Sequence, residues 1–221
     1  MDIEQARFNM VEQQIRTWEV LNPAVLDLLF TVRREDFVSA AYRSLAFADM
    51  EIPIGHAQLM MAPKMEARIL QELDLKPTDR VLEIGTGSGY LTALLAKRAA
   101  SVTSVEYFED LSREAAARLA QADIANVHLK VGDAADHPCA AIAAPEQFDA
   151  IVFAGSVPMP PRGWLDALAP GGRLFAIVGD APVMKAMLFT TAGANTYASR
   201  ELFETVVPPL INAPQLSRFS F

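Results

Sequence analysis

Three glycines at alternate positions are the feature of this sequence that most directly indicates chemistry. Gly85, Gly87 and Gly89 follow the apolar run 81–84 and precede a segment whose apolar residues have helical spacing. Glycine permits a sharp turn and lets a ligand approach the backbone closely. The helix that follows offers free N–H groups and partial positive charge. The pattern therefore predicts a ligand-binding turn made by Gly85, Thr86, Gly87, Ser88 and Gly89.

Two acids stand at the ends of the next two predicted strands, residues 102–106 and 127–131. Glu106 ends the first strand, roughly twenty residues after Gly85, where a carboxylate can bind the two hydroxyls of a ribose. Asp133 stands just after the second strand, beside Ala134, and can accept a hydrogen bond from an adenine amino group. These positions fall at the carboxyl ends of predicted strands, which is where open α/β sheets bind ligands.

Two cofactors fit this outline, a nicotinamide dinucleotide and S-adenosyl-L-methionine. A dinucleotide prefers Gly-x-Gly-x-x-Gly, whereas the spacing here puts Tyr90 where the third glycine would stand. Glu83 also places a negative charge beside the turn, which opposes a pyrophosphate but suits an amino group. S-adenosylmethionine carries an amino group and a sulfonium cation and has no phosphate. The residues therefore favour S-adenosylmethionine and disfavour the alternative of a nicotinamide-dependent oxidoreductase.

The elements that would position these residues alternate between strand and helix. Strands are predicted over residues 80–84, 102–106, 127–131, 148–153, 173–178, 185–191 and 197–206, and helices over residues 91–100, 111–121 and 162–168. This alternation predicts an α/β fold: a doubly wound, mostly parallel seven-stranded sheet, Rossmann-like, with helices on both faces. No helix separates the last two strands, so this end of the sheet is expected to be antiparallel.

The first part of the chain has a different character. Apolar residues from Met10 to Trp18 have helical spacing, and Asn22-Pro23 predicts the capped start of a second helix. Residues 47–62 predict a loop, and Pro63 the start of a third helix. We expect a single domain over 1–221, in which 1–79 form a helical elaboration with a substrate loop and 80–221 form the cofactor-binding core.

Composition excludes several classes of function. The net charge is −8 with no run of Lys and Arg, which argues against nucleic-acid binding. No segment approaches the ~18 apolar residues of a membrane span, and the acidic start differs from a secretory signal. The single Cys139 excludes an internal disulfide, and His56, His128 and His137 do not suggest a metal site. We expect a cytoplasmic protein.

Taken together, the motifs resemble the protein-L-isoaspartate O-methyltransferase family of class I S-adenosylmethionine-dependent methyltransferases. The matching segments extend over nearly the whole chain, at residues 34–38, 46–49, 53–58, 82–90, 132–133, 148–149 and 171–174. The resemblance implies methylation of the α-carboxyl group of isoaspartyl residues in damaged proteins, which starts their repair. A carboxylate, with a pKa near about 4, is already a nucleophile at neutral pH. The enzyme need only align it with the methyl group and exclude water, so no general base is expected.

The substrate loop departs from the family pattern. The family's Thr-Ile-Ser-x-Pro is replaced by Leu59-Met60-Met61-Ala62-Pro63, so Met61 stands where the family has a serine that contacts the reacting carboxylate. Methionine cannot donate a hydrogen bond, and losing one to a charged group costs about 1.5–3 kcal/mol. Met61 therefore takes the catalytic serine's position. The acceptor-side candidates are Phe47, which replaces a tyrosine, and His56, Gln58, Leu59, Met60 and Met61.

The altered loop leaves three hypotheses open for the acceptor side. The protein methylates isoaspartyl proteins or peptides, or it methylates another, more apolar small acceptor, or it binds the cofactor without catalysis. Met60 and Met61 are flexible and suit an apolar pocket, and they are equally compatible with packing beside the third helix. We expect S-adenosylmethionine binding to be intact and isoaspartyl carboxylates to be handled poorly.

Overall fold

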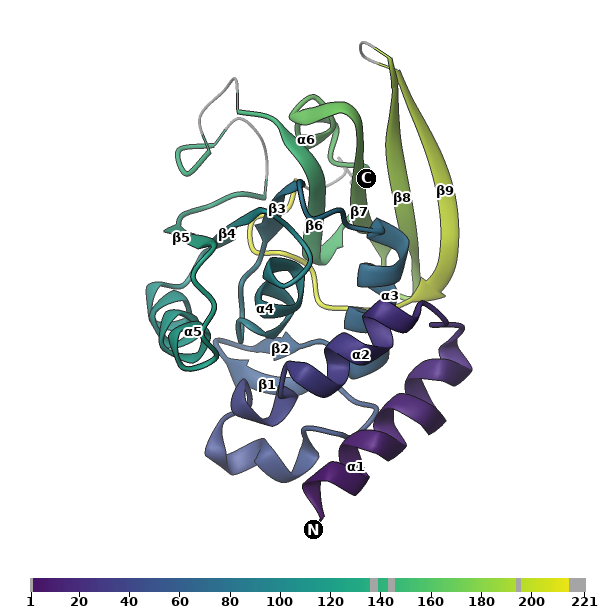
Figure 1. The fold of residues 1–221 in the computed structure, drawn as a ribbon. Helices are drawn as coiled ribbons and strands as arrows, with labels where there is room; N and C mark the ends of the chain where they lie inside the picture. The colour runs from purple at the N-terminus through teal and green to yellow at the C-terminus, as the bar shows by residue number, and fades with distance from the viewer. Residues whose placement is uncertain (1, 136–138, 143–145, 194–195, 215–221) are drawn as a thin grey trace, which may run out of the picture.

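The computed structural model describes residues 2–135, 139–142, 146–193 and 196–214. Its centre is a seven-stranded sheet with the order β5-β4-β3-β6-β7-β8-β9 (Figure 1). The strands are β3 (Arg80–Ile84), β4 (Ser101–Glu106), β5 (Val127–Val131), β6 (Phe148–Val157), β7 (Leu168–Asp180), β8 (Val183–Gly193) and β9 (Thr196–Thr205). Strands β3 to β7 pair in parallel, and β8 and β9 add antiparallel. The predicted fold class is confirmed.

The strand order reverses beside β3. The chain runs outward from β3 through β4 to β5 and then returns to place β6 on the other side of β3. Ligands of open α/β sheets bind at such a switch point, beyond the carboxyl ends of the strands. The turn after β3 and the loops after β4, β5 and β6 are therefore the segments that can build a site.

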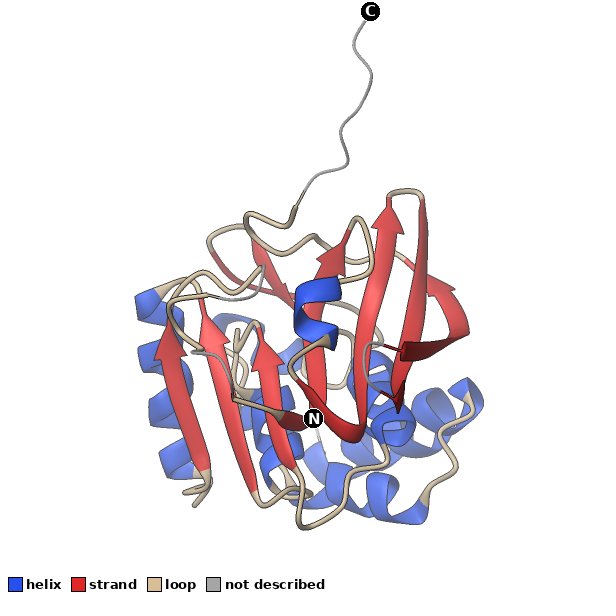
Figure 2. Cartoon of the chain, turned by 90° about the horizontal axis from the view of Figure 1, so that it is seen from above, coloured by secondary structure: helices blue, strands red, loops and turns tan. Residues whose placement is uncertain are grey.

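The two faces of the sheet are covered unequally. The helices α3 (Pro63–Leu73), α4 (Tyr90–Ala96) and α5 (Glu109–Gln121) contribute to the core on one face. The other face is covered by the short α6 (Arg162–Leu165) and by loop residues such as Ala134 and Ile142. Most helices accordingly lie along one side of the strands (Figure 2). Helices α4 and α6 end earlier than predicted, at Ala96 and Leu165.

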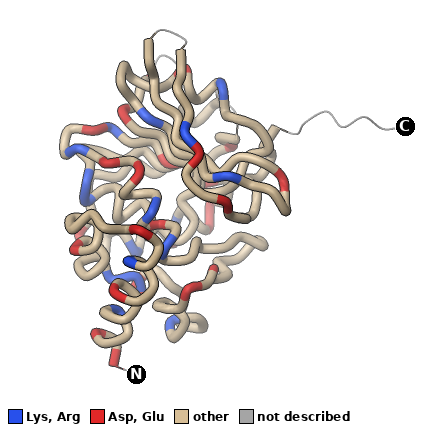
Figure 3. The backbone as a smooth tube through the Cα atoms, turned by 90° about the vertical axis from the view of Figure 1, so that its right-hand side faces the viewer, with Lys and Arg blue, Asp and Glu red and all other residues tan. Residues whose placement is uncertain are grey.

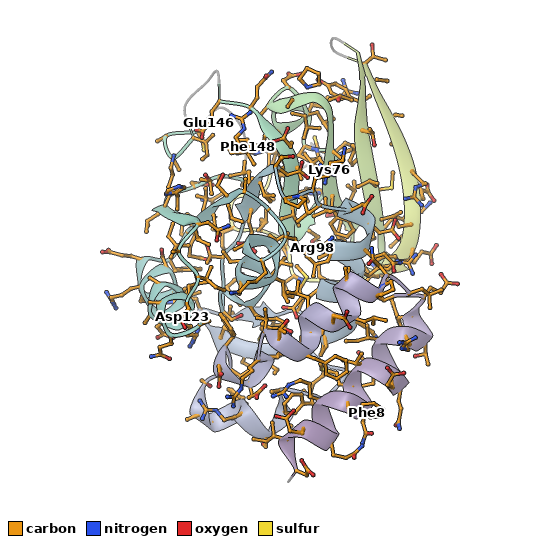
Figure 4. The ribbon with its side chains drawn as sticks, viewed as in Figure 1. Phe8, Lys76, Arg98, Asp123, Glu146 and Phe148 are labelled. Atoms are coloured by element: carbon orange, nitrogen blue, oxygen red, sulfur yellow. The ribbon has the colours of Figure 1, made fainter. Side chains whose placement is uncertain are left out.

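Successive side chains of β6 point alternately into the cores on the two faces of the sheet. Ala150 and Val152 belong to the core beneath the large helices, whereas Ile151 and Phe153 belong to the core on the α6 side. This is the period of two that a strand buried on both faces requires. Phe148, at the start of β6, is buried, whereas Phe8 on the first helix is half exposed (Figure 4).

The N-terminal layer is helical, as predicted. It consists of α1 (Ile3–Asn9), the π-helical turn η1 (Met10–Ile15), α2 (Pro23–Thr31) and the 3₁₀ turns η2 (Arg16–Trp18), η3 (Arg34–Asp36) and η4 (Ala40–Leu45). The Asn22 side chain accepts a hydrogen bond from the Ala24 N–H and Pro23 is the first helical residue, so the predicted cap is confirmed. The layer shares one apolar core with the sheet, because Met10 and Ile15 cluster with Val102.

A hairpin replaces the loop predicted over residues 47–62. Strand β1 (Ile52–Gly55) pairs antiparallel with β2 (Gln58–Met60), and His56 and Ala57 form the turn. Both turn residues have positive φ, 50° and 55°, as a two-residue hairpin turn of this kind requires. Such turns usually carry asparagine or glycine, so His56-Ala57 gave no signal for a hairpin.

Candidate cofactor and acceptor site

A cavity of about 960 Å³, including its open mouth, lies at the switch point of the sheet. Its walls come from the hairpin, the glycine turn, the loops after β4 and β5, Ala154 and Gly155 of β6, and residues 207–211. Segments far apart in the chain thus converge on one space, as the strand order predicts.

The glycine turn forms one wall. Gly85, Gly87 and Gly89 have φ of 96°, 52° and 85°, a region that favours glycine. A β-carbon on Gly89 would lie 3.1 Å from the Ala115 β-carbon of α5, so Gly89 packs against that helix and does not line the cavity. The other members of the predicted turn line the cavity: Gly85, Thr86, Gly87 and Ser88.

Glu106 is held rigidly at the end of β4. Its carboxylate accepts hydrogen bonds from the Gly87 N–H (2.8 Å) and the Phe108 N–H (3.0 Å), one on each oxygen. The side chain is almost fully buried, and it lines the cavity. A carboxylate offers about four lone-pair positions, so two remain for a ligand. The side chain is preorganised to accept from a pair of hydroxyls.

The segment after β5 supplies Asp133 and Ala134, which both line the cavity. Asp133 accepts hydrogen bonds from the Ala135 N–H (3.1 Å) and the Asn212 side-chain amide (2.7 Å). The indole N–H of the buried Trp164 donates to the Ala134 carbonyl at 3.1 Å. These contacts fix the Asp133 side chain and the backbone of the two residues that follow it.

Glu83 lies outside the cavity lining, which differs from the prediction that it adjoins the ligand. It is fully buried beneath the turn, where Oε2 accepts hydrogen bonds from the Thr92 and Ser104 hydroxyls. Ser104 also contacts the Thr86 hydroxyl at 2.6 Å. Burial raises the pKa of Glu83 to about 8. Its direct contacts are with the groups that support the turn.

Four of the acceptor-side candidates line the cavity: Gln58, Leu59, Met60 and Met61. They are contributed by β2 and by the residue that follows it. Met60 and Met61 are buried within the main core as well as facing the cavity. The two interpretations of these methionines, packing and pocket lining, are therefore both satisfied.

Phe47 and His56 are not among the lining residues. Phe47 is buried in the N-terminal layer, where its carbonyl accepts a hydrogen bond from the Gln14 side chain at 3.1 Å. His56 stacks on Phe108, with ring centroids 4.0 Å apart, and its Nε2 lies 2.8 Å from the Asp110 carboxylate. Since His56 sits at the hairpin tip, its ring joins the hairpin to the start of α5.

Several lining residues were not predicted from the sequence. They include Glu51, Glu66, Tyr107, Phe108, Leu111 and Gly155. Residues 207–211, which also line the cavity, are anchored to β6, because Ser156 and the backbone of Pro208 and Leu210 exchange hydrogen bonds of 3.0 Å. A β-carbon on Gly155 would lie only 2.9 Å from Leu210. A glycine near the end of β6 was therefore the one sequence feature that could indicate the close approach of this segment.

The charges that line the cavity are acidic. Among the described lining residues, Glu51, Glu66, Glu106 and Asp133 are acids, and none is Lys, Arg or His. Burial raises the pKa of Glu66 to about 7 against the opposing effect of Arg34, and burial also raises the pKa of Glu51. Elsewhere on the chain the two signs of charge are interspersed (Figure 3).

Within the described ranges, no group of three His, Cys, Asp or Glu residues could hold a metal ion. His137 lies outside these ranges. No helix in the described part of the chain is long and apolar enough to cross a membrane.

The sheet order, the glycine turn and the acid that ends β4 define a class I S-adenosylmethionine-dependent methyltransferase fold. The family model of protein-L-isoaspartate(D-aspartate) O-methyltransferase (PCMT) matches residues 5–212, and the chain belongs to this family. S-adenosylmethionine is the methyl donor of this family, so the predicted family and cofactor are confirmed.

Individual relatives agree with this assignment. The chain is 38% identical over 207 residues to protein-L-isoaspartate O-methyltransferase 1 of Rhodopseudomonas palustris, covering 93% of this chain and 82% of the relative. It is 42% identical over 184 residues to protein-L-isoaspartate O-methyltransferase of Opitutus terrae, covering 80% and 76%. A Plasmodium falciparum protein assigned to the same activity, solved with S-adenosyl-L-homocysteine, has the same fold, with a TM-score of 0.78 at 21% identity, covering 92% of this chain and 97% of that one.

Proposed function

We propose that this protein transfers a methyl group from S-adenosylmethionine to the α-carboxyl group of isoaspartyl residues in proteins and peptides. The observation that carries the proposal is that one cavity is lined both by the glycine turn with Glu106 and by residues 58–61 of the hairpin segment. A donor on the first wall and an acceptor on the second would meet in the same cavity. The acidic composition and the single cysteine support a cytoplasmic location.

The residues that line the cofactor wall fit S-adenosylmethionine. The two lone pairs left on Glu106 suit the hydroxyls of a ribose, and Asp133 suits the amino group of an adenine. The described lining residues include acids but no Lys, Arg or His. An acidic lining suits a cationic ligand and opposes a pyrophosphate. When bound, the cofactor supplies an activated methyl group on a sulfonium.

The chain's own contribution to the reaction is positional. The acceptor carboxylate needs no base, because it is ionised at neutral pH. An oxygen–methyl bond forms as the sulfur–methyl bond breaks, so the carboxylate must lie in line with that bond. Leu59, Met60 and Met61 give the acceptor wall an apolar surface that excludes water. On the cofactor wall, Glu106 fixes the position of the glycine turn by accepting a hydrogen bond from the Gly87 N–H.

Transfer of a labelled methyl group tests the proposal. An isoaspartyl peptide would be compared with the peptide of the same sequence that contains ordinary aspartate. We expect base-labile ester on the isoaspartyl peptide only. Equal labelling of both peptides, or of neither with cofactor bound, would contradict the proposal.

A second candidate acceptor is a more apolar small molecule. The observation that favours it is Met61, which lines the cavity at the position where the resemblance places the family serine. Without that hydroxyl, a carboxylate loses a hydrogen-bond donor. Labelled methyl transfer into an organic extract of small molecules would reveal this activity. Label confined to added isoaspartyl peptide would exclude it.

A further inference from the structure

The guanidinium group of Arg34 is buried and bonds to three separate segments. Its Nε donates to the Ala46 carbonyl at 2.9 Å, and its Nη2 donates to the Met61 carbonyl at 2.6 Å. Its Nη1 forms an ion pair with Glu66 of α3. Arg34 is only 1% exposed, so these contacts are what compensate for the burial of its charge.

Two of these partners face the cavity: Met61, in the acceptor wall formed by residues 58–61, and Glu66 on α3. Met61 and Glu66 line the cavity, whereas Arg34 does not. The Met61 carbonyl is bound directly, which fixes the backbone where β2 leads into α3. Any influence of Arg34 on an acceptor must therefore pass through the Met61 backbone and the Glu66 carboxyl group.

The same guanidinium reaches toward the cofactor wall. It lies 5.0 Å from the centre of the Tyr90 ring, within the range of a cation–π contact. The Tyr90 N–H donates to the Ser88 hydroxyl at 3.2 Å, and Ser88 lines the cavity. Arg34 thus contacts the acceptor wall directly and the glycine turn through one intervening residue.

Lysine could not reproduce this arrangement. The planar guanidinium directs five N–H groups in a fixed fork, so it can bond two carbonyls and a carboxylate while its face covers a ring. A lysine ammonium would keep the charge beside Glu66, but it is a compact point charge on a flexible stem and cannot hold all of these partners in one geometry. The substitution Arg34→Lys therefore separates the charge of Arg34 from its geometry.

We propose that Arg34 is a positioning residue that fixes Met61 and Glu66 relative to the glycine turn and thereby sets the affinity for the acceptor. It contacts neither substrate. The inference rests on the proposed function, since it takes residues 58–61 as the acceptor wall.

Arg68 provides a matched control. It lies on α3, the helix that carries Glu66, but its contacts are made away from the cavity. Its Nε pairs with Glu72 at 2.9 Å and its Nη1 donates to the Trp18 carbonyl at 2.9 Å. Its guanidinium lies 5.4 Å from the Phe203 ring centre. Arg68 also pairs with Glu19 at 3.3 Å. It therefore has two carboxylates, a carbonyl and a ring as partners, where Arg34 has one carboxylate, two carbonyls and a ring, and none of the Arg68 partners lines the cavity.

Steady-state kinetics with an isoaspartyl peptide, at pH 8, compare Arg34→Lys with Arg68→Lys. We expect Arg34→Lys to raise the KM for the peptide roughly tenfold or more, with the KM for S-adenosylmethionine and the affinity for S-adenosylhomocysteine changed less than about twofold. Arg68→Lys should leave all three unchanged. An unchanged peptide KM in Arg34→Lys, or equal effects in both variants, would overturn the proposal.

Hydrogen exchange gives a measurement that does not depend on activity. We expect the amides of residues 58–62 to exchange faster in Arg34→Lys than in the wild type and in Arg68→Lys. Equal exchange in all three would overturn the positioning role. If the wild type does not methylate the isoaspartyl peptide, the proposed function fails while this comparison still tests Arg34. Should Arg34→Lys not fold, the double variant Arg34→Met/Glu66→Met, which leaves no unpaired charge, takes its place in both experiments.

Discussion

The side chain of Ile54 covers Gly87: a β-carbon at residue 87 would lie 3.1 Å from the Ile54 Cδ1 atom. Ile54 belongs to the hairpin and Gly87 to the turn after β3, and both line the cavity. The hairpin therefore closes directly on the glycine turn. This contact links the two walls that the proposed reaction requires.

Gly87→Ala is expected to weaken cofactor binding. The substitution adds a methyl group against Ile54 and forces a non-glycine residue to φ +52°, which costs about 1–2 kcal/mol in backbone conformation. Calorimetric titration with S-adenosylhomocysteine should show at least about a tenfold loss of affinity.

Gly171→Ala controls for the backbone effect. Gly171 has φ +75°, and a β-carbon there would meet nothing within 4 Å. Both variants should lose similar stability, but only Gly87→Ala should lose affinity. Equal affinity in the two variants would show that the cofactor does not bind against this turn.

Glu106→Gln is expected to reduce cofactor affinity by about ten- to a hundredfold. An amide has one acceptor oxygen, so it cannot accept from the Gly87 and Phe108 N–H groups on separate oxygens and also serve two hydroxyls. Glu201→Gln, in an exposed pair with Lys185, serves as the control. Unchanged calorimetric affinity in Glu106→Gln would remove this residue from the site.

The cofactor wall was largely predictable from the sequence, because it depends on local patterns. Buried strands that end in glycine or an acid have a clear pattern, and the order of parallel strands brings those ends together. Gly85, Glu106 and Asp133 accordingly line the cavity as expected. Glu83 does not line it, because its side chain lies within strand β3 and is directed away from the strand end, toward Thr92 and Ser104.

The acceptor wall was less predictable, because it depends on contacts between distant segments. Nothing near His56 in the sequence indicates its partner Asp110, and the hairpin turn lacks the usual residues. The carbonyl that Arg34 binds belongs to Met61, 27 residues away. The family resemblance, and not periodicity, located residues 58–61.

Stability is expected to fall as pH rises from about 5 to 8, and Glu83 is expected to cause part of this. Burial raises its pKa from 4.5 to about 8, so in this range the folded state holds a proton that the unfolded state has released. Unfolding free energy then decreases with rising pH, by up to a few kcal/mol. Glu66, whose pKa is about 7, acts in the same direction.

Glu83→Gln should flatten this dependence, since glutamine can accept from Thr92 and Ser104 without titrating. Urea unfolding at three pH values would measure it, with the exposed Glu109→Gln as control. Parallel pH curves for wild type and Glu83→Gln would contradict the assignment of the effect to Glu83.

His56→Ala is expected to speed the release of S-adenosylhomocysteine. The ring stacks on Phe108 and bonds to Asp110, so it fastens the hairpin tip beside the cofactor wall. His56 and Asp110 are both partly exposed, so the loss of these contacts is expected to change stability little. Stopped-flow measurement should show dissociation about fivefold faster. The strand residue His128, replaced by alanine, should have no effect; equal rates in both variants would count against a fastened hairpin.

The most direct measurement is methyl transfer from labelled S-adenosylmethionine to an isoaspartyl peptide, with wild type and Met61→Ser assayed side by side. Met61 lines the cavity and offers no hydrogen-bond donor, whereas serine would restore one. We expect slow but specific transfer by the wild type and a lower peptide KM in Met61→Ser. Absence of transfer by both proteins, each with cofactor bound, would contradict the proposed function.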